Sequence, residues 1–177
     1  MKLRRTTWPS ELADRVRAAA TADGMSRDDV LAAIEAPDGW AAGTRSAVYL
    51  PTNGHAVRRV PWEQVERAEW NADSSTFHLW EAAPFGTPMR RTDLVVDNPG
   101  RFGQLVRERI NASVLIQRHV PLVGKHGVRV VGRRSPAAAD PEVRWSLVLD
   151  NGLDPDQPGL LDRAEDALRQ VREEFGM

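Results

Sequence analysis

The feature that most constrains the fold is a run of short strand-like segments with no helix-forming stretch between Val30 and Asn98. Segments rich in β-branched and aromatic residues alternate there with turns rich in Pro, Gly, Asn and Asp. Neighbouring parallel strands need a crossover of roughly a dozen residues or more, usually a helix. The sequence therefore predicts an antiparallel meander and excludes a doubly wound α/β fold for this part of the chain.

Six or seven strands are expected in the meander, and the first of them has an alternative interpretation. The expected strands are 30–36, 40–44, 47–50, 55–60, 65–70, 76–81 and 91–96. Ser26 and Asp29 resemble a capping box, which would start a helix instead. The strong turn at Pro37-Asp38-Gly39 favours a hairpin over that helix. Asn53-Gly54 is typical of a tight hairpin turn between the third and fourth strands.

Helical patterns lie at the two ends of the chain and directly after the meander. Apolar spacing predicts a first helix over 10–21 and a C-terminal amphipathic helix from about Pro158. The clearest helix start is Asn98-Pro99, because Asn caps well and Pro suits the first helical position. Its apolar stripe consists of Phe102, Leu105, Val106 and Ile110. Three more strands are expected after this helix, at 113–120, 127–133 and 143–149.

These elements predict an α+β protein with three consecutive parts. Residues 1–27 form an N-terminal helical segment, and 28–112 form the antiparallel meander with its closing helix. Residues 113–177 add three strands and the terminal amphipathic helix, packed with the preceding part as one globular unit.

The order of elements over 28–112, about half of the chain, resembles the bacterial pleckstrin-homology-like (PH-like) domains. The most characteristic stretch is Val60–Trp70, where the chain turns at Pro61-Trp62 and then resumes as a strand. The other matching segments are 30–35, 40–44, 47–50, 76–79, 94–96 and the helix 99–109. The resemblance implies an antiparallel barrel closed by a helix, serving as a binding module for peptides, proteins or lipid head groups. The lipid role is not carried over, because the first hairpin carries Glu35 and Asp38 with only Arg45 nearby.

The residue types that carry most enzyme chemistry are missing or scattered in the sequence. Absence of cysteine excludes disulfides, thiolate metal sites and cysteine nucleophiles. The phosphate-binding, dinucleotide-binding, serine-hydrolase and zinc-protease motifs are also absent. No two of the four histidines stand three or four residues apart, and Glu66 and Glu69 are expected on opposite faces of one strand. We therefore expect no catalytic, cofactor-binding or metal-binding residues, and no enzymatic activity.

Charge is segregated along the chain although the whole carries a formal net charge of −1. Residues 90–134 hold ten basic residues against three acidic ones, and 140–177 hold ten acidic residues against four arginines. The candidate partner-binding residues are Arg118, Lys125, Arg129, Arg133 and Arg134. Arg129 and Arg133 are expected on one strand face, with Arg134 pointing the other way. The alternative is that the acidic terminal helix docks near these strands and neutralises them.

These observations favour an interaction or adaptor module that binds a protein partner through a sheet edge or through the basic surface. The alternative is a protein that binds nucleic acid or another anionic ligand through the Arg-rich segment 90–134. Self-association through an edge strand or the terminal helix is a third option. No run approaches the roughly 18 apolar residues of a membrane span. The N-terminus also has no apolar core of a secretory signal, so we expect a cytoplasmic protein.

Overall fold

The computed structural model describes residues 8–25, 27–52, 56–139 and 142–176. These residues form three α-helices, a short 3-10 helix and ten strands. The helices are α1 (Ser10–Ala22), η1 (Trp62–Gln64), α2 (Gly100–Ser113) and α3 (Leu160–Glu174). The strands are β1 (Ala32–Ala36), β2 (Gly39–Gly43), β3 (Ala47–Pro51), β4 (Val57–Pro61), β5 (Val65–Asn71), β6 (Thr76–Glu81), β7 (Arg91–Val95), β8 (Val114–Val123), β9 (His126–Arg133) and β10 (Arg144–Leu149).

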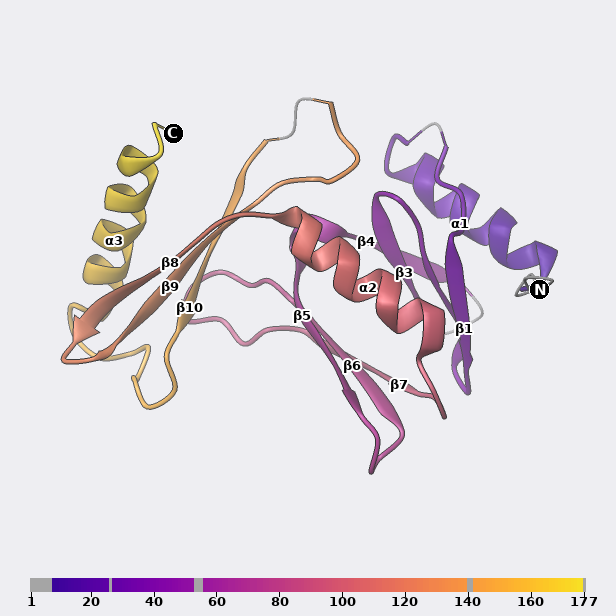
Figure 1. The fold of residues 1–177 in the computed structure, drawn as a ribbon, viewed down its shortest axis with the longest axis horizontal. Helices are drawn as coiled ribbons and strands as arrows, with labels where there is room; N and C mark the ends of the chain where they lie inside the picture. Colours follow the sequence, from indigo (N-terminus) through magenta and orange to yellow (C-terminus); the bar gives the residue numbers. More distant parts are fainter. Residues whose placement is uncertain (1–7, 26, 53–55, 140–141, 177) are drawn as a thin grey trace, which may run out of the picture.

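The ten strands form three antiparallel sheets, which confirms the α+β class (Figure 1). Sheet A has the order β1-β2-β3-β4, sheet B the order β5-β6-β7, and sheet C the order β10-β9-β8. The first segment of the meander is a hairpin of β1 and β2, as the turn at 37–39 predicts, and not a helix from Ser26. The predicted turn at Asn53-Gly54 lies outside the described residues.

Sheets A and B remain separate over the described residues, so the closed barrel expected from the sequence is not formed. The strands β4 and β5 follow each other in the chain but do not pair. Pro61 ends β4 and has no N–H for a neighbouring strand. The turn at η1 then buries Trp62, whose Nε1 donates to the carbonyl oxygen of Thr44 (3.2 Å). This anchor directs the chain away from sheet A before β5 begins.

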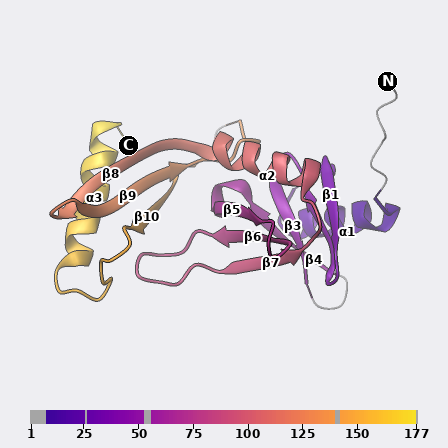
Figure 2. The ribbon, with the colours of Figure 1, turned by 60° about the horizontal axis from the view of Figure 1, so that its bottom comes forward.

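Helix α2 packs against both sheets and fills the space between them (Figure 2). The helix begins at Gly100 with Pro99 at the N-cap position, one residue later than expected, and it has no side-chain cap hydrogen bond. The side chain of Asn98 accepts a hydrogen bond from the N–H of Gly100 (2.8 Å) directly before the first turn. The four stripe residues Phe102, Leu105, Val106 and Ile110 are all buried. Close approach to β2 depends on Gly43, where a Cβ atom would lie 2.7 Å from Leu105 Cδ2.

Two further apolar clusters lie at the ends of the molecule (Figure 1). Helix α1 covers the other face of sheet A through Leu12, Val16 and Ala20. Helix α3 covers one face of sheet C, where Ala167 and Val171 join a cluster with Val128 and Val130 of β9. Phe85, in the long loop between β6 and β7, packs on this last cluster and links sheet B to sheet C.

A buried carboxylate fixes the segment that connects α1 to sheet A. The Oδ2 atom of Asp28 accepts hydrogen bonds from Thr44 Oγ1 (2.8 Å), Ser46 Oγ (2.6 Å) and Tyr49 OH (2.9 Å). Burial, and then the hydrogen bond to Asp28, raise the pKa of Tyr49 far above its ordinary value.

The burial of Tyr49 predicts how the stability of the protein changes at alkaline pH. Because Tyr49 is the only tyrosine, tyrosinate absorbance reports on this residue alone. The folded state holds the phenol protonated, whereas an unfolded chain would release its proton near pH 10. Stability is therefore expected to be retained below about pH 10 and lost as the pH rises further. Tyrosinate absorbance measured during a pH titration should appear only as the protein unfolds.

The control for this titration is Tyr49→Phe, which keeps the ring but has no phenol to ionise. We expect its stability to lose this alkaline dependence. A tyrosinate signal with a midpoint near pH 10 in a protein whose circular dichroism is still native would contradict the buried hydrogen bond to Asp28.

Candidate functional site

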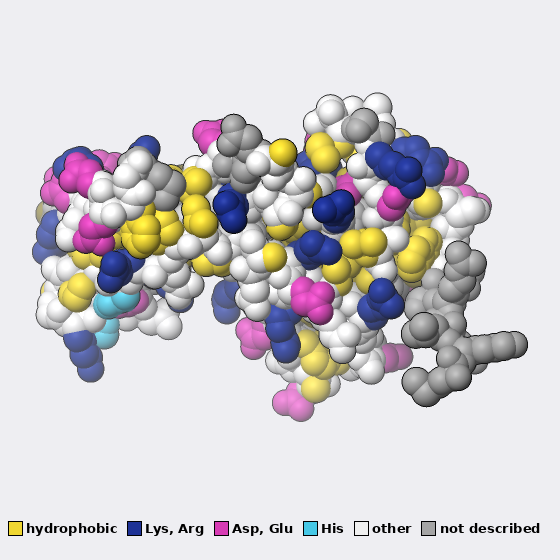
Figure 3. Space-filling model, turned by 45° about the horizontal axis from the view of Figure 1, so that its top comes forward, with side chains coloured by type: hydrophobic (Ala, Val, Ile, Leu, Met, Phe, Trp, Pro, Cys, Tyr) yellow, Lys and Arg dark blue, Asp and Glu magenta, His cyan; other side chains and the backbone are white. Residues whose placement is uncertain are grey.

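The five basic residues predicted from the sequence do not form one exposed patch. Arg133 is buried, with only 5% of its side chain exposed, whereas Lys125 and Arg134 are exposed. On the face shown in Figure 3, Lys and Arg side chains are scattered over the molecule. Arg118 lies in β8 and forms an ion pair with Glu174 of α3 (3.2 Å), so the acidic terminal helix supplies its counter-ion.

Arg129 and Arg133 do share one face of β9, and that face meets Glu66 of β5. A carboxylate oxygen of Glu66 lies 3.4 Å from an Arg133 nitrogen, and the other oxygen lies 3.9 Å from Arg129. Glu66 is buried and Glu69 is exposed, as expected for residues on opposite faces. Besides this ion pair, the buried guanidinium of Arg133 donates to the carbonyl oxygen of Glu66 (2.9 Å) and to Ser113 Oγ (3.2 Å). These hydrogen bonds offset the cost of burying its charge. It joins sheet C to sheet B and is not a surface residue.

Two adjoining hollows form a groove between β5 and α2. One has a volume of about 320 Å³ and lies where β5 and α2 meet sheet C. The other has a volume of about 240 Å³ and extends toward the start of α2. Ala68 of β5 and Arg107 of α2 line both hollows, so the two hollows adjoin at these residues. We call this the β5–α2 groove.

The backbone of β5 turns free hydrogen-bonding groups toward this groove. The N–H of Glu81 in β6 donates to the carbonyl oxygen of Arg90 on the β7 side (2.9 Å). Because backbone groups alternate along a strand, odd-numbered residues of β6 bond toward β7 and even-numbered ones bond to β5. The partners of those even-numbered residues are Asn71, Glu69 and Arg67. Ala68 and Trp70 therefore direct their N–H and C=O groups away from β6, at the edge of the sheet.

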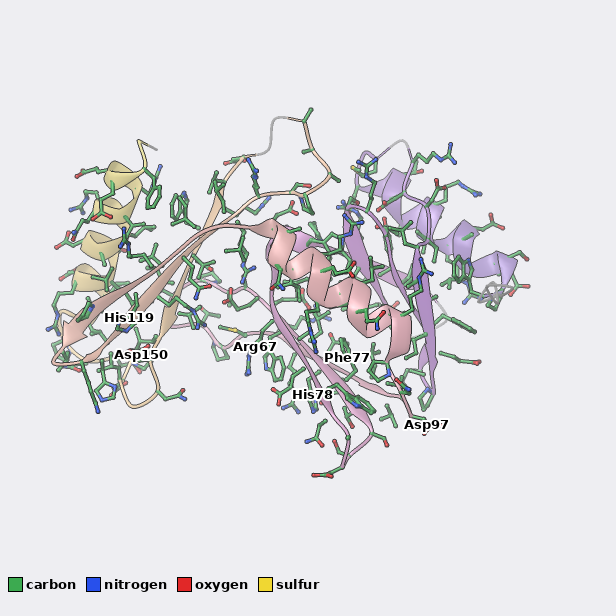
Figure 4. The ribbon with its side chains drawn as sticks, in the orientation of Figure 1. Arg67, Phe77, His78, Asp97, His119 and Asp150 are labelled. Atoms are coloured by element: carbon green, nitrogen blue, oxygen red, sulfur yellow. The ribbon has the colours of Figure 1, made fainter. Side chains whose placement is uncertain are left out.

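The end of the groove nearest sheet C is lined by four arginines and one carboxylate. The arginines are Arg67, Arg107, Arg129 and Arg133, and the carboxylate is Glu66. We call this end the arginine pocket. The guanidinium carbon of Arg67 lies 3.7 Å from the centroid of the Trp80 ring, a cation–π contact that holds this side chain in place. Figure 4 shows Arg67 on the side of β5 that faces sheet C.

Sequence reasoning identified only part of this pocket. Arg129 and Arg133 were candidates, but Arg67 lies outside the Arg-rich segment and Arg107 gave no signal beyond its charge. The odd spacing of Glu66 and Glu69 correctly predicts that they lie on opposite faces of the strand. It does not predict that Glu66 contacts arginines. Only the packing of β9 against β5 brings these residues together.

The exposed histidine–carboxylate pairs lie apart from the groove and from each other. His119 Nε2 is 2.8 Å from Asp150, and His78 Nδ1 is 2.7 Å from Asp93 (Figure 4). The hydrogen bonds from His119 and from the N–H of Gly127 lower the pKa of Asp150. Burial alone would raise the pKa of Asp93, but the hydrogen bond with His78 and the charge of Arg91 lower it overall. Among the described residues, no three His, Cys, Asp or Glu side chains gather as a metal site would require.

No family model, curated protein or solved structure matches this chain. Within the part of the chain that the structure describes, no helix is both long and apolar enough to cross a membrane.

The buried ion pair predicts a large loss of stability when its cation is removed. Arg133→Met leaves Glu66 buried without its nearest counter-ion, which typically costs about 3–5 kcal/mol. We expect the free energy of unfolding, measured with urea, to fall by that amount. The matched control is Arg134→Met, a neighbouring exposed arginine, which should change it by no more than about 0.5 kcal/mol. Equal effects of the two substitutions would contradict the structural role of Arg133.

Proposed function

We propose that this protein is a non-enzymatic interaction module that binds an extended segment of a partner protein along the free edge of β5. The supporting observation is the β5–α2 groove, which has unpaired backbone groups of Ala68 and Trp70 along one side. An extended peptide can add to such an edge as a further strand, with its side chains entering the flanking hollows. Trp70, with the buried Phe77 behind it, gives the end of the groove nearest the start of α2 an apolar lining for those side chains.

Three other sheet edges are less suited to strand addition. Pro121 interrupts the edge strand β8, and Pro61 ends the edge strand β4. Proline on an edge removes a backbone donor and protects against pairing. The other edge of sheet B, β7, carries the charged residues Arg91 and Asp93. Strand β5 has no proline and lies beside a hollow on its open side.

The order of the sheets supports the proposed relationship to PH-like domains over 28–112. A four-stranded antiparallel sheet is followed by a three-stranded one and then by helix α2. We propose on this basis that residues 28–112 act as a cytoplasmic peptide-binding domain. Nucleic-acid binding through 90–134 is the weaker proposal, because Arg118 is ion-paired and Arg133 is buried. An extended basic surface of the kind that follows a phosphate backbone is therefore interrupted.

The test removes one backbone donor from each edge of sheet B. Ala68→Pro removes the outward N–H of β5, and Val95→Pro removes an outward N–H of β7 in the same way. Each tagged protein is used to capture partners from nuclease-treated and untreated native lysate. We expect the wild type and Val95→Pro to enrich the same protein under both treatments. Ala68→Pro should lose it while keeping a native circular dichroism spectrum.

Two results would overturn the proposal. Capture that survives Ala68→Pro would exclude strand addition at β5. Capture that disappears after nuclease treatment would favour the nucleic-acid alternative, which also predicts a steep loss of affinity with added salt.

A further inference from the structure

The arginine pocket carries more positive charge than its own residues neutralise. Arg67 stacks on Trp80 and forms an ion pair with Glu69 (3.7 Å), so its charge is already balanced. The other three arginines share a single carboxylate, Glu66, which serves as counter-ion to Arg133 and lies 3.9 Å from Arg129. Arg107 is exposed and has no ion-pair partner among the described residues. The Nε atom of the buried Arg133 also has no hydrogen-bond partner there. Two positive charges thus remain in excess around a hollow of about 320 Å³.

The positions of the arginines around the pocket strengthen the attraction of this excess positive charge for an anion. Arg129 and Arg133 enter from β9 and Arg107 enters from α2, so these cations line the hollow from two elements. Partial burial reduces the screening that solvent gives to charges on an open surface. Guanidinium groups present paired donors that match the oxygen atoms of phosphate.

We propose that the arginine pocket receives a phosphorylated serine or threonine of the segment bound in the β5–α2 groove. This inference rests on the proposed function, because Ala68 lies both on the free edge and in the pocket wall. A strand paired with that edge would lie roughly 4.8 Å from β5, within reach of a short phosphorylated side chain. A phosphate monoester carries about −1.5 to −2 charges and three acceptor oxygens, against one charge on a carboxylate. It therefore suits an excess of two positive charges better than Asp or Glu does.

The experiment compares peptide pools of randomised sequence that differ only at their central residue. The three pools carry phosphoserine, unmodified serine or glutamate at that position, and binding is measured by fluorescence anisotropy. We expect the phosphoserine pool to bind at least about tenfold more tightly than the other two, the effect of one or two charge-assisted hydrogen bonds. Inorganic phosphate should compete with it more effectively than chloride at equal ionic strength.

Two arginines of α2 provide a matched pair of variants. Arg107→Ala removes a pocket guanidinium, whereas Arg101→Ala removes an exposed arginine of the same helix outside the pocket. Arg107→Ala should lower affinity for the phosphoserine pool about tenfold and leave the serine pool unchanged. Arg101→Ala should change both by less than about twofold. Because Arg107 is exposed on a helix, loss of folding is not an expected consequence, and circular dichroism checks this.

The outcomes separate this inference from the proposed function. Equal binding of the three pools, abolished by Ala68→Pro, would overturn the phosphate inference and leave strand addition at β5 in place. No binding of any pool would overturn both. Tighter binding of a single-stranded oligonucleotide than of the phosphoserine pool, weakened by Arg107→Ala, would assign the pocket to nucleic acid instead.

Discussion

The buried pair of Glu66 and Arg133 is the interaction on which the rest of the structure depends. Arg133 of β9 donates to the backbone of Glu66, lies beside its carboxylate, and donates to Ser113 at the last residue of α2. One guanidinium therefore fastens three elements together: β5, α2 and β9. The fork of donors on arginine suits this role, since each donor direction is fixed relative to the others. The edge of β5 and the flank of α2, which form the groove, are held in register at this point.

The Glu66–Arg133 ion pair contributes more to the relative orientation of sheets B and C than to the stability of the fold. Replacing a buried ion pair by well-packed apolar residues is often neutral or stabilising, because two ions must be taken out of water. The apolar contact between sheets B and C is supplied elsewhere, by Phe85 at the end of the long β6–β7 loop. Apolar contacts are not directional. Phe85 can hold the two sheets near each other, whereas the Glu66–Arg133 pair determines which part of β9 faces which part of β5.

Local features of the sequence predict the elements well and their assembly poorly. Asn98-Pro99 marks the start of α2, and the turn at 37–39 marks the first hairpin, because capping and turn chemistry act within a few residues. Arg129 and Arg133 share a face because they are four residues apart in a strand. The burial of Arg133 depends on its contact with Glu66, which lies 67 residues earlier in the chain. No local sequence pattern predicts that contact. The separation of sheets A and B is equally non-local, since it depends on β4 and β5 failing to pair.

The arginine pocket is composite, and this explains what the C-terminal part adds to the meander. Arg67 and Arg107 are exposed in the folded protein, where water and salt screen their charges. Strand β9 brings two further guanidinium groups together with Glu66 and closes one side of the hollow. Because β8 begins at the residue after α2 ends, little freedom separates this added sheet from the helix that lines the groove. The third sheet thus adds a positively charged wall at one end of the free β5 edge.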